Sequence, residues 1–164
     1  MAKPTKYAPH ICTAVSILAL IGIIWGLLAS NTLVIVILLI PAAIYEVYRT
    51  EGRSTKSASI ILLILLIAQI FLILFNVDFN LAEFLGSTQQ MVGGYLVPLG
   101  EISVVTPTLM AVLSVILFVR TRGIYTRWLA VTLFITCFAI IYSVDPDVFT
   151  ELFRYGIQEG LRRV

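Results

Sequence analysis

The sequence predicts an all-α integral membrane protein, built as a bundle of five transmembrane helices. Two observations predict this class: the composition is 60% hydrophobic and only 12% charged, and the apolar residues gather in long runs. Soluble domains have about 45–50% apolar and about 25% charged residues, and their surfaces could not carry such an excess. With 164 residues and a mean hydropathy of +1.03, the chain has room for one membrane bundle and no separate large domain.

Each apolar run is close to the roughly 20 residues that a helix needs to cross the hydrocarbon core. The runs are apolar on all sides and lack the alternation of transmembrane strands, so helices are expected. The predicted spans are residues 11–28, 32–48, 58–75, 102–119 and 125–142. The first run is longer than the apolar part of a signal peptide and more spans follow it, so we expect it to be retained.

Lysine and arginine alternate between the links of the predicted bundle. They occur before the first span and after the second and fourth spans, whereas the links after the first and third spans carry none. Because cytoplasmic loops are enriched in Lys and Arg, this pattern predicts a multi-pass protein of the cell membrane with a cytoplasmic N-terminus. Five crossings leave the C-terminus outside. The net charge of +2 is too small to indicate a nucleic-acid partner.

The link of residues 76–101 interrupts the apolar sequence with polar residues and with Gly93, Gly94 and Glu101. Its first part has the apolar spacing of a short amphipathic surface helix, and its second part has no periodicity. We expect an external or shallow re-entrant segment, because irregular backbone at membrane depth must be shielded from lipid. The order Val-Gly-Gly-Tyr differs from that of a potassium-channel filter, so the glycines are interpreted as loop hinges. If this segment crosses the membrane, the C-terminus lies in the cytoplasm instead.

Polar groups within or beside the spans suggest a candidate path for an ion or a proton. Glu46 ends the second span, Gln69 lies inside the third, and Glu101 precedes the fourth. Ionisable residues in lipid are costly and are functional candidates by default, and Gly93 and Gly94 would complete the path. Structural roles are favoured: an ion pair of Glu46 with an arginine one turn away, a hydrogen bond between helices for Gln69, and headgroup contact for Glu101.

Gly22, Gly26 and Ser30 predict a helix-packing face, because small residues four positions apart let a second helix backbone approach closely. The motif does not distinguish packing within the chain from a dimer. Hydroxyl residues of the last two spans could pack in the same way or line a polar path, and packing is the favoured use. These hydroxyl residues are Ser103, Thr106, Ser114, Thr132, Thr136 and Ser143.

Two units follow from these patterns: residues 1–144 form the membrane bundle, and residues 145–164 form an amphipathic C-terminal helix. Asp145 and Pro146 make a favourable helix start, and several apolar residues after them share one helix face. We expect this helix to lie on the membrane surface or to dock a partner.

The sequence favours a non-enzymatic structural or accessory subunit of a membrane assembly. The single histidine and the cysteines Cys12 and Cys137 form no metal-ligand or CxxC pattern, so we expect no metal site and no cofactor. Motifs for a catalytic nucleophile or a phosphate-binding loop are missing. The expected partners are the lipid bilayer and either further copies of the chain or a larger membrane complex. The alternative is a small oligomeric ion or proton channel or transporter, with its path through the third span, the polar link and the fourth span.

Overall fold

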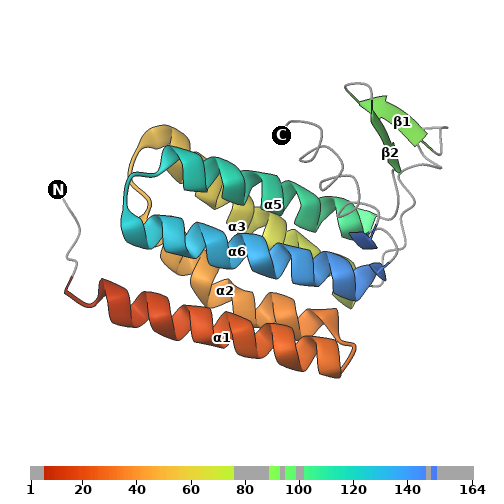
Figure 1. Ribbon diagram of the computed structural model, residues 1–164, viewed down its shortest axis with the longest axis horizontal. Helices are drawn as coiled ribbons and strands as arrows, with labels where there is room; N and C mark the ends of the chain where they lie inside the picture. Colours follow the sequence, from red (N-terminus) through yellow and green to blue (C-terminus); the bar gives the residue numbers. More distant parts are fainter. Residues whose placement is uncertain (1–5, 76–88, 93–94, 99–101, 147–148, 151–164) are drawn as a thin grey trace, which may run out of the picture.

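The computed structural model describes residues 6–75, 89–92, 95–98, 102–146 and 149–150. Within this part of the chain, five long helices form a bundle and two short strands form a hairpin (Figure 1). The helices are α1 (Ala8–Leu28), α2 (Thr32–Arg49), α3 (Arg53–Leu74), α5 (Ile102–Arg120) and α6 (Ile124–Val144). Each helix covers one predicted span almost entirely, because the length of the apolar run determines which residues can be buried in hydrocarbon.

Local chemistry sets the helix boundaries. The Asn31 side chain caps α2 by accepting a hydrogen bond from the Leu33 backbone N–H at 3.1 Å, which satisfies one of the unpaired donors of the first turn. Pro9 lies in the first turn of α1, where its missing N–H removes no helical hydrogen bond. Gly52 precedes α3 with a φ of +103°, a conformation that a residue with a Cβ atom rarely adopts. Short turns therefore connect α1, α2 and α3.

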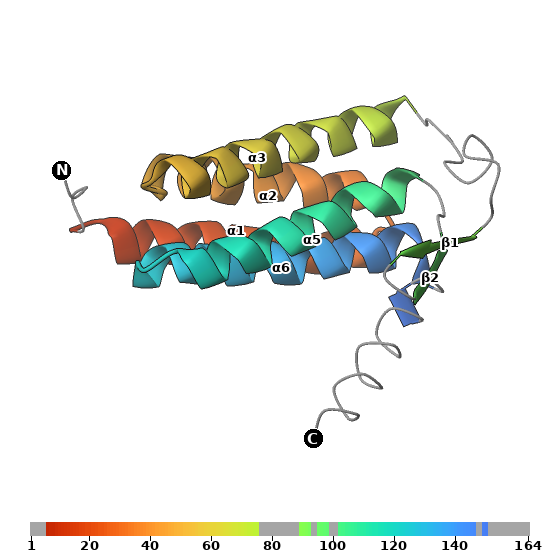
Figure 2. The same ribbon diagram turned by 90° about the horizontal axis from the view of Figure 1, so that it is seen from above.

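Consecutive helices run antiparallel, and α6 closes the bundle by packing against α1 and α2 as well as α5 (Figure 1). Figure 2 shows α3 on one side of the bundle and α6 on the other. The hydrophobic core lies between the helices. It includes the fully buried side chains of Leu39 in α2, Leu62 in α3, Leu117 in α5 and Leu133 in α6.

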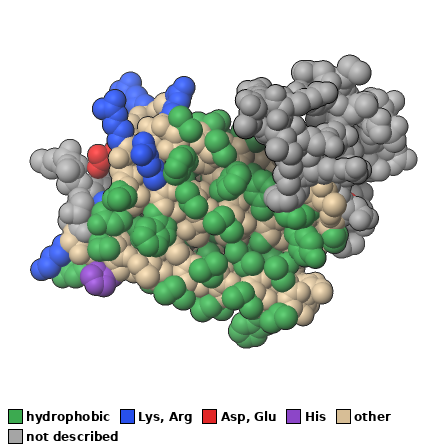
Figure 3. All heavy atoms as spheres, in the orientation of Figure 1, with side chains coloured by type: hydrophobic (Ala, Val, Ile, Leu, Met, Phe, Trp, Pro, Cys, Tyr) green, Lys and Arg blue, Asp and Glu red, His purple; other side chains and the backbone are tan. Residues whose placement is uncertain are grey.

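The outward faces of the helices are apolar as well (Figure 3). Ile24 of α1, Ile64 of α3 and Ile135 of α6 are exposed. Four helices, α1, α2, α3 and α6, are long and apolar enough to cross a membrane. The apolar segment Val104–Arg120 of α5 is shorter. A helix that is apolar both toward the core and away from it fits a lipid environment.

A strand pair stands in the polar link, where the sequence predicted irregular backbone. β1 (Gln89–Val92) and β2 (Tyr95–Pro98) are antiparallel, with Val92 opposite Tyr95. A two-residue Gly-Gly connection is typical of a tight hairpin, but four residues on each side are too few to give a clear alternation. The short amphipathic helix predicted before the hairpin lies outside the described residues.

The predicted C-terminal amphipathic helix also lies mostly outside the described residues, which include only Asp145, Pro146, Phe149 and Thr150 of that segment. α6 ends with Asp145 as its C-cap. The Phe149 backbone N–H donates to the Asp145 carbonyl oxygen at 3.2 Å. The Phe149 ring packs edge-on against Tyr142, with centroids 5.4 Å apart, and against Phe138 at 6.2 Å. The start of the tail therefore packs on the end of α6.

Candidate functional site

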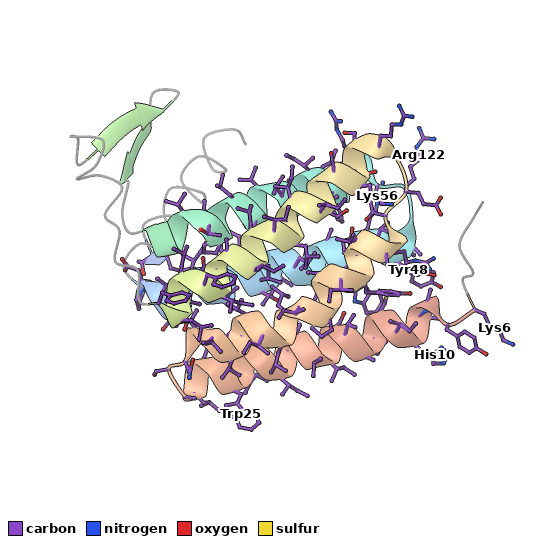
Figure 4. All side chains as sticks on the ribbon, turned by 180° about the vertical axis from the view of Figure 1, so that it is seen from behind. Lys6, His10, Trp25, Tyr48, Lys56 and Arg122 are labelled. Carbon is purple, nitrogen blue, oxygen red and sulfur yellow. The ribbon has the colours of Figure 1, made fainter. Side chains whose placement is uncertain are left out.

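One end of the bundle, called here the basic end, carries every lysine and arginine of the described residues. Figure 4 labels Lys6, Lys56 and Arg122 at this end and Trp25 at the opposite, far end, and Figure 3 shows the cationic side chains gathered there. The structure gives these cations no ion pair within its described residues. Antiparallel helices bring alternate links to one end, and so the alternation along the chain becomes a charge asymmetry. The cations are Lys6, Arg49, Arg53, Lys56, Arg120, Arg122 and Arg127.

Glu46 lies in the last turn of α2 near the basic end and is fully buried. The Thr50 hydroxyl donates to its Oε1 at 3.1 Å and to its backbone carbonyl at 2.7 Å. Its Oε2 atom has no hydrogen-bond partner among the described residues. The predicted ion pair with an arginine is absent there too: the Arg49 guanidinium instead lies over the Tyr125 ring, 5.1 Å from its centroid. A cation–π contact across helices has replaced the expected contact along α2.

Gln69 of α3 is also fully buried, but it lies far from Glu46. α2 and α3 meet at the basic end, Glu46 is close to that end, and Gln69 is much farther along α3. At 1.5 Å per residue, the two side chains are separated by about 20 Å along the bundle. The fully buried Leu62 and Leu66 of α3 lie at intermediate levels. The other members of the candidate path, Gly93, Gly94 and Glu101, lie outside the described residues.

The buried hydroxyl groups mostly bond to the backbone of their own helix. Ser114, which is fully buried, donates to the Ala111 carbonyl oxygen at 2.7 Å. Thr136, also fully buried, donates to the Thr132 carbonyl oxygen at 2.8 Å. Such bonds satisfy a hydroxyl in an apolar interior without requiring water. Gln69 and Ser114 are closed to solvent, whereas a conduit would need them to be wet.

The small-residue face of α1 packs against α2 of the same chain. A Cβ atom added at Gly22 would lie 2.8 Å from the Cβ of Leu38, and one added at Gly26 would clash with Ile35. These two glycines therefore allow close approach of the first two helices. Ser30 does not share this role, because it follows α1 in the turn, is exposed, and has a φ of +50°. The sequence motif alone did not choose between an internal and a dimeric contact.

A groove runs between α1 and α6, and sequence reasoning missed it. Its volume is about 480 Å³, and this α1–α6 groove is lined by residues that include Leu20 and Ile23 of α1, Phe118 of α5, and Arg127, Trp128 and Ile135 of α6. The only feature of the sequence that pointed to this groove was the pair Thr132 and Thr136, which belongs to the predicted set of hydroxyl residues in the last two spans.

A small hydrogen-bonded cluster joins the two helices at this groove. The Trp128 indole N–H donates to the Ser16 hydroxyl at 2.9 Å. The hydroxyls of Ser16 and Thr132 lie 3.1 Å apart and share a hydrogen bond. Ser16 was not singled out from sequence, because a lone serine in a uniformly apolar run has no recognisable pattern.

The described residues contain no group of three or more His, Cys, Asp or Glu side chains that could hold a metal ion. Cys12 and Cys137 are both buried free thiols. Comparison of the chain with protein-family models, with curated proteins and with solved structures found no significant match. The function must therefore be argued from the chemistry of the bundle.

Proposed function

We propose that the chain is a multi-pass protein of the cell membrane with five crossings. Four helices have the required length and hydropathy, and α5, with 19 residues, would extend about 28 Å, close to the roughly 30 Å of the hydrocarbon core. The basic end faces the cytoplasm, because Lys and Arg are enriched in cytoplasmic links. The N-terminus is then cytoplasmic and the C-terminus is outside.

Within the membrane, the protein acts as a non-enzymatic structural or accessory subunit of a larger assembly. One observation carries this proposal: polar groups that a conduit would need to be wet are instead buried, with Ser114 and Thr136 satisfied by their own helices and Gln69 closed to solvent. Polar groups satisfied in this way need no water. Other hydroxyl pairs, Ser16 with Thr132 and Thr32 with Ser143, form hydrogen bonds between helices and hold the bundle together. The faces left for a neighbour are the exposed apolar sides of the helices.

Site-specific photocross-linking in native membranes tests the subunit proposal. A photoreactive amino acid would replace Ile24 of α1 or Ile64 of α3, both of which face outward, and the buried Leu62 of α3 would serve as the control position. We expect a discrete adduct of constant stoichiometry from one outward position and none from Leu62. A chain that yields no intermolecular adduct from any outward face, at native expression level, would not be an assembly subunit.

A small ion or proton channel or transporter is the second candidate, and one observation favours it: the buried Oε2 atom of Glu46 has no described hydrogen-bond partner. Buried carboxyl groups in membrane proteins often belong to ion or proton pathways. Flux from liposomes that contain the purified protein tests this candidate, with Glu46→Gln, Gln69→Leu and Glu101→Gln run in parallel.

Glu51→Gln provides the matched control for the flux assay, because Glu51 is a glutamate near the same end of the bundle but is exposed. A conduit predicts flux that Glu46→Gln abolishes and Glu51→Gln preserves. The subunit proposal predicts no flux of protons or common cations from any of these variants. Equal flux from wild type and all variants would reflect nonspecific leak and would exclude the proposed path.

A further inference from the structure

Among the described residues, the α1–α6 groove has a mainly apolar lining and a single cation. Leu20, Ile23 and Ile135 are among its lining side chains, and Arg127 lines it near the start of α6, at the basic end. The volume of about 480 Å³ lies within the range of roughly 300–1,000 Å³ for small-molecule sites. A ligand that fills this groove should therefore have a long apolar part and an anionic group at one end.

The polar groups inside the groove are already engaged with one another. Trp128 donates to Ser16, and Ser16 shares a hydrogen bond with Thr132. Thr132 Oγ1 also lies 3.1 Å from the carbonyl oxygen of Trp128 and Thr136 donates to that of Thr132. The hydroxyl and indole groups that line the groove therefore already have hydrogen-bond partners. A hydrocarbon chain can lie against them without leaving a polar group unsatisfied.

Arg127 is held in place but keeps part of its donor capacity. Its Nε donates to the Thr121 carbonyl oxygen at 3.0 Å, and its Cζ lies 5.8 Å from the centroid of the Phe118 ring. Within the described residues, no other hydrogen bond or ion pair of this guanidinium is present. The donors of its two terminal nitrogens can then bind a phosphate, which arginine recognises with paired N–H groups.

We propose that the α1–α6 groove binds an anionic phospholipid from the leaflet at the basic end. One acyl chain lies along Leu20, Ile23 and Ile135, and Arg127 binds the phosphate. Basic pockets between transmembrane helices on the cytoplasmic side are suited to anionic headgroups. Trp128 is near the start of α6, and indole rings are enriched at membrane interfaces. The charge of Arg127 favours this occupant over an apolar partner helix. This inference does not depend on whether the chain is a subunit or a conduit.

Fluorescence of Trp128 provides the test, because the chain has only two tryptophans and Trp25 lies at the far end (Figure 4). A Trp25→Phe protein in vesicles of phosphatidylcholine would be titrated with phosphatidylglycerol or phosphatidylcholine carrying the same brominated chains, which quench nearby indole rings. We expect the brominated phosphatidylglycerol to quench Trp128 with an apparent affinity about fivefold higher, the ratio given by roughly one Lys or Arg contact. A Trp128→Phe protein reports on Trp25, and we expect no headgroup preference there.

Two further variants separate the proposed contact from the general charge of the basic end. Arg127→Gln should abolish the preference for phosphatidylglycerol, whereas Arg122→Gln should preserve it, because Arg122 is exposed at the same end but does not line the groove. Equal losses in both variants, or equal quenching by the two lipids in the Trp25→Phe protein, would overturn the proposal. Absence of quenching by either lipid would show instead that protein covers the groove.

Discussion

At the residue scale, Glu46 shows how a carboxyl group in the last turn of an apolar helix can be buried by its own bundle. Its spacing from Arg49 suggested a simple ion pair along α2, but the guanidinium packs on the Tyr125 ring of α6. Among the described residues, the Thr50 hydroxyl donates the hydrogen bond to this carboxyl group. An isolated helix cannot reveal this arrangement, because Tyr125 is brought to Arg49 only by the packing of α6 against α2.

Replacing Thr50 by valine should destabilise the protein by about 1–3 kcal/mol, because the Oε1 atom of Glu46 would lose its donor in a buried position. The measurement is reversible unfolding in detergent micelles, completed as a double-mutant cycle with Glu46→Leu. We expect Thr50→Val to cost less in the Glu46→Leu background. Thr13→Val removes a similar bond on the exposed side of α1 and should change stability by less than about 0.5 kcal/mol. Strict additivity of the Thr50 and Glu46 changes would contradict the coupling.

At the element scale, the α1–α2 pair depends on the absence of side chains at Gly22 and Gly26. Leu38 and Ile35 of α2 occupy the space that a Cβ atom would take. The turn between the helices adds to this arrangement, because Asn31 caps α2 and its backbone N–H donates to the Gly26 carbonyl oxygen at 2.8 Å. The small-residue motif therefore serves the internal hairpin of α1 and α2.

Gly26→Ala should destabilise the bundle by about 1–3 kcal/mol, because the added methyl group overpacks the contact with Ile35. Leu28→Ala changes a neighbouring side chain that is 82% exposed and should have little effect in the same unfolding assay. Both variants should keep the oligomeric state of the wild type, as judged by size-exclusion chromatography with light scattering. A stable Gly26→Ala protein with an altered oligomeric state would indicate that this face forms a contact between chains instead.

At the scale of the whole molecule, the described cations lie at one end of an otherwise apolar bundle. They come from three segments, namely the residues before α1 and the connections from α2 to α3 and from α5 to α6. Their common location follows from the antiparallel order of the helices. Contacts such as Arg120 with Ser54, at 3.0 Å between Nη1 and Oγ, connect links that are distant in sequence. This asymmetry is the basis of the proposed orientation, in which the basic end faces the cytoplasm.

Labelling of one introduced cysteine at a time tests the proposed orientation. Ser30→Cys and Ser54→Cys introduce the same change at exposed positions at opposite ends of the bundle, and the native Cys12 and Cys137 are buried. In intact cells, a membrane-impermeant maleimide should label Ser30→Cys and leave both Ser54→Cys and the wild type unlabelled. After the membrane is permeabilised, Ser54→Cys should react as well. Labelling of Ser54→Cys alone in intact cells would place the basic end outside.

The positions of the five helices were predictable from sequence, because the length and hydropathy of a run are local properties. The alternation of charged links likewise predicted that cations would share one end. The strand pair was not predicted, since its two four-residue segments are too short to show an alternation.

The sequence by itself therefore determined an apolar helical bundle with a basic end. The tertiary structure decided which faces of those helices meet: Gly22 and Gly26 against α2, Arg49 over Tyr125, and Ser16 with Trp128 beside the α1–α6 groove. The physical reason is that these helices are apolar on nearly all sides, so no polar stripe marks the face that turns inward. Helix association in such a chain is decided by close packing and a few hydrogen bonds, which exist only once the helices are assembled.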